Sequence, residues 1–282
     1  MIIVNSVSGG KTSAYMAVHY PADVNVFALV LIDCKKSVPR DKGLIEEVKK
    51  RVPNFVATHE DDQTLKAVLN LEQYLGQEIK WVSSEFALEQ FVRGTTDLPG
   101  YRSAARLFDS RTRFCTIEQK IRPIANYLEI YENDGDPVLM QIGFRADEPK
   151  RVESWNCKND KIKIPVSCNL KTRRVSYNFR EWRVADFPLY RDRITKSHVA
   201  DFWKDKIDFP EISNCRFCPF HTDIQLQRQA QKYPENLQWW LDLENLTGHT
   251  FDNGRPLIDR LNQALIPGIY NDDDLRSCHC TD

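Results

Sequence analysis

Apolar runs alternate with segments of helical spacing through the first half of the chain. Runs typical of strands lie at residues 2–4, 24–32, 55–58, 79–84 and 138–142. Apolar side chains spaced three and four apart predict helices at residues 41–51, 62–75, 86–93 and 117–131. This alternation predicts an α/β fold with a doubly wound, mostly parallel sheet.

The residues that follow the predicted strands are expected to gather at one edge of the sheet, where open α/β sheets bind ligands. Asp33 follows the long run 24–32 and is a candidate contact for the base or ribose of a nucleotide, or a cap for the next segment. Gly143 and Arg145 follow the run 138–142. Arg145 is therefore a candidate phosphate contact.

The regular alternation weakens after residue 160. A polar stretch there leads to a predicted helix at residues 197–203 and then to the cysteine-containing end of the chain. We predict a nucleotide-binding domain at residues 1–160 and a smaller, mainly helical subdomain at residues 161–282.

The loop after the first apolar run reads Ser8-Gly9-Gly10-Lys11-Thr12-Ser13. Two glycines allow close approach of the backbone to a ligand, and the amides of the first helical turn attract an anion. A Walker loop, G-x-x-x-x-G-K-[ST], would need a glycine near Ser6, and this chain has none there. The loop predicts a phosphate site of another kind.

Composition narrows the class of protein. A chain of 282 residues with 41% hydrophobic residues can bury a full core, and its formal net charge of −1 argues against a uniformly basic nucleic-acid binder. Because no apolar stretch is long enough to span a membrane and no signal peptide is recognisable, we expect a cytoplasmic protein with no membrane partner. Eight cysteines then point to metal or thiol chemistry rather than disulfides.

The pair Cys215-x-x-Cys218 can present two thiolates to one metal ion and forms half of a four-ligand site. Cys115, which lies among arginines, is the preferred third ligand, and Cys157 is the fourth. Zn²⁺ and an iron–sulfur cluster both accept four thiolates, so the spacing leaves the two open. The other donors that remain open are Cys34, Cys168, His221, Cys278 and Cys280.

Three further features bear on large or anionic partners. Arginines are frequent at residues 102–113 and 173–183, which are candidates for a polyanion surface. Trp239 and Trp240 could stack bases, although anchoring of the C-terminal helices is the favoured interpretation. Lys120 falls in an early turn of the helix predicted at 117–131, with Thr116 as its cap, so its charge opposes the helix dipole and suggests a functional role.

Together these motifs resemble the phosphoadenosine-phosphosulfate (PAPS) reductase-like branch of the PP-loop ATP pyrophosphatases. The resemblance covers about residues 1–225 and departs at Thr12, where most of that superfamily has Asp. The motifs that carry it are Ser8 to Met16, Cys115-Thr116 with Lys120-Ile121-Arg122-Pro123, Gly143 to Glu148, and Asn214-Cys215-Arg216-Phe217-Cys218.

This resemblance implies a site for ATP or a related adenine nucleotide, with Mg²⁺ left open by Thr12. It implies a 4Fe–4S cluster on Cys115, Cys215 and Cys218, and sulfur transfer through an adenylated substrate. Lys11, Lys120 and Arg145 would stabilise charge on the phosphates. The final substrate, with tRNA and DNA as candidates, and the oligomeric state, with a homodimer as one candidate, stay open.

Two other functions are also compatible with the sequence. A sulfonucleotide reductase would use Cys278 or Cys280 of the tail as its nucleophile, but the ending Ser-Cys-His-Cys differs from the one such enzymes show. A non-catalytic nucleotide- or nucleic-acid-binding module would hold a structural zinc at the cysteines, and Thr12 slightly favours it.

Overall fold

The computed structural model describes residues 1–96, 106–109, 113–131, 136–155, 160–169, 175–212, 214–252 and 254–263. At its centre lies a five-stranded sheet in the order β5-β2-β1-β6-β9, in which every neighbouring pair is parallel. The strands are β1 (Ile3–Val7), β2 (Val24–Leu29), β5 (Ile79–Ser83), β6 (Val138–Gln141) and β9 (Arg183–Asp186). The predicted α/β fold with a parallel sheet is confirmed.

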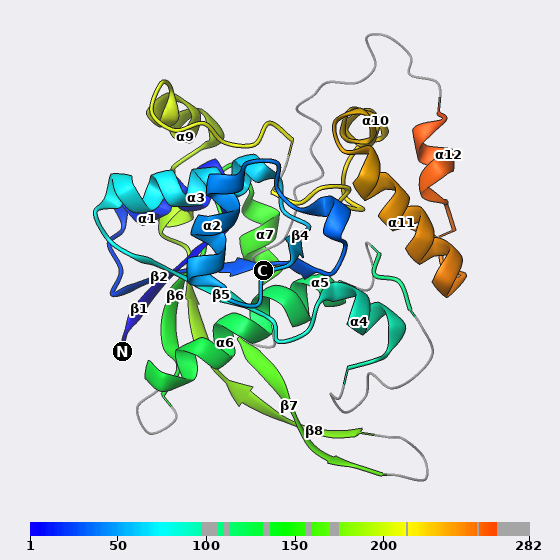
Figure 1. Ribbon diagram of the computed structural model, residues 1–282. Helices are drawn as coiled ribbons and strands as arrows, with labels where there is room; N and C mark the ends of the chain where they lie inside the picture. Colours follow the sequence, from blue (N-terminus) through cyan, green and yellow to red (C-terminus); the bar gives the residue numbers. More distant parts are fainter. Residues whose placement is uncertain are drawn as a thin grey trace.

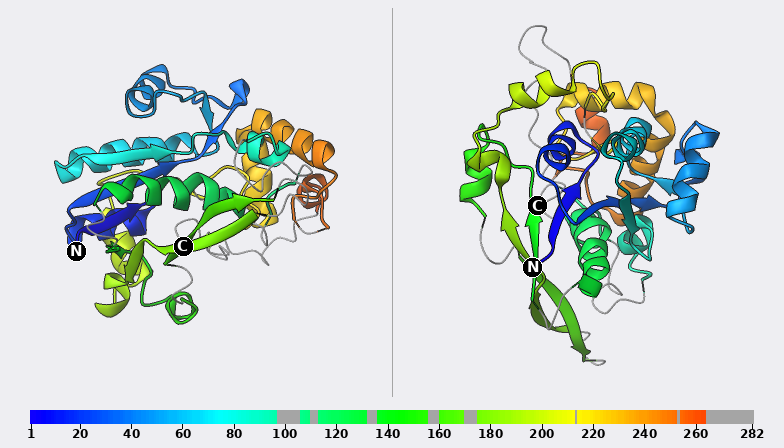
Figure 2. Two further views of the ribbon diagram at one scale, coloured as in Figure 1. Left: turned by 90° about the horizontal axis from the view of Figure 1, so that it is seen from below. Right: turned by 90° about the vertical axis from the view of Figure 1, so that its left-hand side faces the viewer.

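Helices cover both faces of this sheet because its central strands are apolar on both sides (Figure 1, Figure 2). Phe27 and Leu29 of β2 pack in one core, whereas Val26 and Ala28 pack in another. The first core is covered by α1 (Lys11–His19), α2 (Lys42–Arg51), α3 (Asp62–Leu75) and α9 (Lys196–Trp203). The second is covered by α6 (Arg122–Leu128).

The expected single strand at residues 24–32 is two strands, so that prediction was wrong. After β2 ends at Leu29, the Val30 carbonyl accepts hydrogen bonds from the His59 amide and the Thr58 hydroxyl. These bonds turn the chain into β3 (Leu31–Ile32), which pairs antiparallel with β4 (Ala57–Thr58) outside the main sheet.

The helix expected at residues 117–131 begins earlier and changes pitch. It starts with α5 (Phe114–Thr116) and passes through a π-helical stretch, η2 (Ile117–Ile121), before α6 and the 3₁₀ turn η3 (Glu129–Tyr131). Thr116 has helical dihedral angles and is not a cap. Lys120 therefore lies inside a continuous helix, and π-helical stretches of this kind are frequent at functional sites.

The remaining elements lie around the sheet. A hairpin of β7 (Lys161–Cys168) and β8 (Val175–Glu181) precedes β9, and the short helices α7 (Pro149–Glu153) and α8 (Pro188–Arg191) flank it along the chain, with the turn η1 (Lys35–Ser37) following β3. A third core joins α4 (Leu88–Arg93) to α10 (Asp223–Lys232), α11 (Pro234–Thr247) and α12 (Leu257–Leu261). The boundary at residue 160 stays a prediction, although β9 belongs to the central sheet.

None of the helices in the described part of the chain is long and apolar enough to cross a membrane.

Candidate functional site

The turn between β1 and α1 needs a glycine at position 9. Gly9 has φ +79°, which side chains rarely adopt, and a Cβ there would lie 2.4 Å from Thr64 Cγ2. Both the backbone conformation and the contact with α3 thus hold the loop close to its neighbours.

Two serines hold this loop in shape. Ser13 Oγ accepts a hydrogen bond from the Ser8 amide at 3.0 Å, lies 3.0 Å from Ser8 Oγ, and donates to the Gly10 carbonyl at 3.1 Å. No described side chain caps the first turn of α1. Its amides are therefore placed to bind an anion, with the exposed Lys11 as the first residue of the helix.

Arg145 is brought to the loop as the sequence suggested. Its Nη1 donates to Thr12 Oγ1 at 3.0 Å, while Asp147 and Glu148 hold the rest of the guanidinium through ion pairs of 3.1 and 3.4 Å. Gly143 lies beside the same threonine, since a Cβ there would be 3.4 Å from Thr12 Cγ2. Thr12 thus accepts a hydrogen bond from a cation.

Asp33 does not follow a strand of the central sheet, contrary to the expectation from the sequence. The residue that follows the parallel strand β2 is Val30, and Asp33 follows β3 instead. The amide of Asp33 donates to both carboxylate oxygens of Glu89 at 2.9 and 3.0 Å. A role for Asp33 at a nucleotide stays a prediction.

Three of the four predicted metal ligands line a single cavity. Cys115 reaches it from α5, and Cys215 and Cys218 reach it from the loop before α10. This thiol cavity is partly open to solvent, and Val30, His59 and Phe108 form part of its wall. Cys157 lies outside the described residues.

A buried ion pair lies next to these thiols. Lys120 Nζ is 3.0 Å from Glu60 Oε1 and 3.5 Å from Cys215 Sγ, and Cys215 Sγ is 3.4 Å from Glu60 Oε2. Burial alone would lower the pKa of Lys120, but Cys215 and Glu60 raise it above its usual value. The lysine therefore remains a cation inside the protein.

Burial raises the pKa of each thiol in the cavity. The pKa of Cys218 rises to about 12, that of Cys115 is raised, and that of Cys215 lies well above its usual value. A bound metal would reverse this effect, because metal ligation stabilises the thiolate. Three thiols around one cavity are donors that suit zinc or an iron–sulfur cluster, although no group of three or more His, Cys, Asp or Glu side chains among the described residues is arranged to hold a metal ion.

The backbone joins the thiol cavity to the loop of residues 8–13. The segment around Cys215 pairs with the chain before α3, as the Asp61 amide donates to the Asn214 carbonyl and the Arg216 amide to the His59 carbonyl, both at 2.8 Å. Thr64, which contacts Gly9, also donates to the Asn214 carbonyl at 3.0 Å. Asn214 thus connects the two halves of the site.

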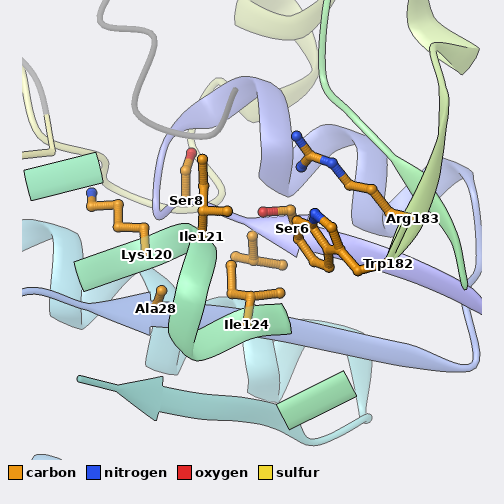
Figure 3. Close-up of a pocket in the computed structure, with 9 residues that line it drawn as sticks. Ser6, Ser8, Ala28, Lys120, Ile121, Ile124, Trp182 and Arg183 are labelled. Carbon is orange, nitrogen blue, oxygen red and sulfur yellow. The ribbon is translucent and has the colours of Figure 1, made fainter. Parts of the chain in front are cut away.

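Lys120 lines a second cavity that reaches the loop (Figure 3). This second cavity, of about 360 Å³, lies between the sheet and the helix that carries Ile121 and Ile124. Ser6 and Ser8 line it from the end of β1, and Trp182 and Arg183 from the start of β9. Lys120 thus lines both the second cavity, which reaches the loop, and the thiol cavity.

The site also contains two residues that the sequence did not single out. Glu60 is fully buried beside Lys120, and His59 lines the thiol cavity with an Nδ1 that makes no hydrogen bond to any described residue. Burial lowers the pKa of His59 to about 3, so the ring is neutral. Both residues follow the two-residue strand β4. The sequence pattern did not indicate that the chain after β4 would lie beside the cysteines.

The structure describes part of the other predicted partner surfaces. Trp239 and Trp240 of α11 are buried in the core, as the favoured interpretation expected, so they anchor the helices and cannot stack bases. Arg183 is also buried. Arg106 is exposed and Arg113 lies over the Phe220 ring at 5.4 Å, while the residues around them at 97–105 and 110–112, like Cys278 and Cys280, lie outside the described chain.

Comparison with known protein families, with curated proteins and with solved structures gave no match for this chain.

Proposed function

We propose that the protein is a PP-loop enzyme of the PAPS reductase-like kind, which binds ATP or a related adenine nucleotide and carries out sulfur transfer. One observation carries the proposal: the phosphate loop and the three thiols meet through Asn214 and Lys120. A nucleotide loop alone would support only binding, whereas cysteines beside it suggest chemistry on an activated substrate.

In this proposal the nucleotide phosphates occupy the loop of residues 8–13. The amides of the first turn of α1 and the exposed Lys11 bind them, and Arg145 offers N–H donors from the side of Thr12. Lys120 lies toward the thiols, where its charge is offset in part by Glu60. It is therefore suited to stabilise charge that develops between the two halves of the site.

The reaction we propose begins when a substrate oxygen attacks the α-phosphorus of ATP. The bond to the bridging oxygen of the β-phosphate breaks, pyrophosphate leaves, and the substrate is adenylated. A sulfur nucleophile then attacks the activated carbon, and AMP departs with the bonding electrons. Fixed cations favour the first step because they stabilise negative charge on the phosphates.

Cys115, Cys215 and Cys218 are the residues that would hold a 4Fe–4S cluster, with Zn²⁺ as the alternative. A bound cluster would supply a soft metal site for sulfur chemistry. The protein's own contribution is the cavity lined by the thiols, its neutral histidine and the buried cation beside Cys215.

Metal content tests the thiol half of this proposal. Protein purified without oxygen should be brown, absorb near about 400 nm and contain about four iron atoms per chain. Cys215→Ser and Cys218→Ser should lose this iron, and Cys34→Ser, a cysteine outside the cavity, should retain it. A colourless protein with stoichiometric zinc would contradict the proposal and favour a binding module.

Calorimetric titration with ATP tests the nucleotide half. Ser13→Ala removes the hydroxyl that bonds to both Ser8 and Gly10 and should weaken ATP binding by at least about tenfold. Ser154→Ala, which removes a hydroxyl bonded to the Arg151 carbonyl on α7, is the control and should bind ATP as the wild type does. Equal affinities for all three proteins would show that ATP does not use this loop.

A further inference from the structure

The β7–β8 hairpin extends from the body of the molecule as a two-stranded arm (Figure 1, Figure 2). Its strands pair with each other and form a sheet of their own. Two strands alone bury little apolar surface, so such an arm is more readily explained by something that it contacts than by a contribution to the core.

One face of the arm carries exposed aromatic rings beside a lysine. Lys163 lies directly opposite Phe179 in the strand register, and Tyr177 is two residues from Phe179, so the three side chains share a face. Phe179 is 63% exposed and Tyr177 is 39% exposed. Lys163 Nζ lies 5.7 Å from the centre of the Tyr177 ring.

The opposite face attaches the arm to the helix that carries the site. Ile162 is buried, and Arg180 pairs with Glu129 beyond the C-terminal end of α6. Farther along the arm, Arg122 at the start of α6 donates to the Lys163 carbonyl at 3.1 Å. The arm is therefore attached to this helix at two positions and projects from there away from the body of the molecule (Figure 1).

The sequence of the arm is strongly basic. Residues 161–181 contain six lysines and arginines and one acidic residue, a formal net charge of +5, whereas the whole chain has −1. Three of these cations belong to residues 170–174, outside the described part of the chain, and Lys161 and Arg180 form ion pairs with Glu181 and Glu129. A second copy of the arm would bring the same charge and be repelled. A polyanion is the complementary partner.

We propose that this arm binds single-stranded nucleic acid, with bases stacked on Tyr177 and Phe179 and Lys163 beside the phosphates. Aromatic side chains among basic residues bind single strands in this way with little dependence on sequence. This inference rests on the proposed function, because the bound nucleic acid would be the substrate of the proposed sulfur transfer.

Fluorescence anisotropy with a labelled single-stranded RNA of about 20 nucleotides, with DNA of the same sequence, and with the matching duplex tests this proposal on the full chain. Tyr177→Ala/Phe179→Ala should weaken single-strand binding by at least about tenfold, because one stacked base contributes about that much. Lys163→Ala should weaken binding and reduce its dependence on salt.

The matched controls are Tyr74→Ala, an exposed aromatic residue of α3, and Lys49→Ala, an exposed lysine of α2, and both should bind as the wild type does. Circular dichroism should show that all variants are folded. Because the arm variants should bind ATP normally and Ser13→Ala should still bind nucleic acid, a failure of the arm is distinguishable from a failure of the nucleotide site.

Three results would overturn the proposal. They are absence of single-strand binding at low salt, binding that Tyr177→Ala/Phe179→Ala leaves unchanged, and a duplex bound as tightly as the single strand. A wild-type dimer in light scattering that this double variant converts to a monomer would assign the arm to self-association instead.

Discussion

Gly9 and Gly76 both adopt left-handed backbone conformations, with φ +79° and +62°, but only Gly9 has close neighbours. Around Gly9, Thr64 and Val68 of α3 leave no room for a Cβ, and Thr64 is also held through its bond to Asn214. Around Gly76 nothing lies within 4 Å of such an atom. The two positions therefore separate the effect of backbone conformation from that of close packing.

Gly9→Ala should lower the free energy of unfolding by about 1–3 kcal/mol more than Gly76→Ala, because only the former adds an overpacked contact. It should also weaken ATP binding, since the loop must move away from α3. Urea unfolding of both variants measures the difference. If both variants lost the same free energy of unfolding, the close packing around Gly9 would make no contribution to stability.

Glu89 gives a prediction about pH at the same scale. Burial raises the pKa of Glu89 above 4.5, even though the Asp33 amide and the Trp239 indole donate to its carboxylate. As the pH falls through this raised pKa toward 4.5, the folded state takes up a proton that the unfolded state does not. Folding stability should therefore rise over this interval.

Glu89→Gln removes the titrating group. When the pH is lowered from about 7 to about 5, the free energy of unfolding of the wild type should increase relative to that of Glu89→Gln. Glu85→Gln, on an exposed residue, should show no such gain. A difference between wild type and Glu89→Gln that does not change with pH would contradict the assignment.

At the scale of elements, the Cys215-x-x-Cys218 loop is fixed to the helices by the side chain between its cysteines. Arg216 is only 1% exposed, forms an ion pair with Asp62 of α3, donates to Asn236 Oδ1 of α11 at 2.9 Å, and lies over the Tyr233 ring at 4.2 Å. This set of bonds positions the thiols without touching them.

Arg216→Ala would leave the half-buried Asp62 carboxylate without its cation and the buried Asn236 Oδ1 without its donor, and should cost about 3–5 kcal/mol of stability. Arg40→Ala is the control, because Arg40 also lies over Tyr233 but is largely exposed, and it should cost less than about 1 kcal/mol. Chemical denaturation measures both. Similar values for the two variants would refute the role given to Arg216.

Elements with strong local signals could be predicted from the sequence. Helices α2 and α3 begin after Asp41 and Asp61, whose carboxylates cap them, and end within a residue of their predicted bounds. The division of residues 24–32 could not be predicted, because it depends on bonds from Thr58 and His59, about 30 residues away. For the same reason, the sequence did not identify Glu60 and His59 as candidate site residues.

At the scale of the whole molecule, segments that are far apart in the sequence form one composite site. The sheet places the loop after β1, the helix with Lys120 and the segment of Asn214 side by side. The sequence indicated most of these residues as separate candidates, including Arg145 beside the loop. It did not indicate that Lys120 would line both cavities or that Glu60 would be buried beside it, because both depend on the tertiary structure. We therefore expect a nucleotide bound at the loop to affect the environment of the thiols.

Electron paramagnetic resonance of the anaerobically purified, reduced protein, with and without ATP, tests this coupling most directly. The account predicts an iron–sulfur signal whose line shape changes when ATP is added, because the nucleotide and the cysteines share Lys120 as a neighbour. Ser13→Ala should show the signal without the change at the same ATP concentration. A protein without an iron signal, or a signal that ATP leaves unaltered in the wild type, would contradict the composite site.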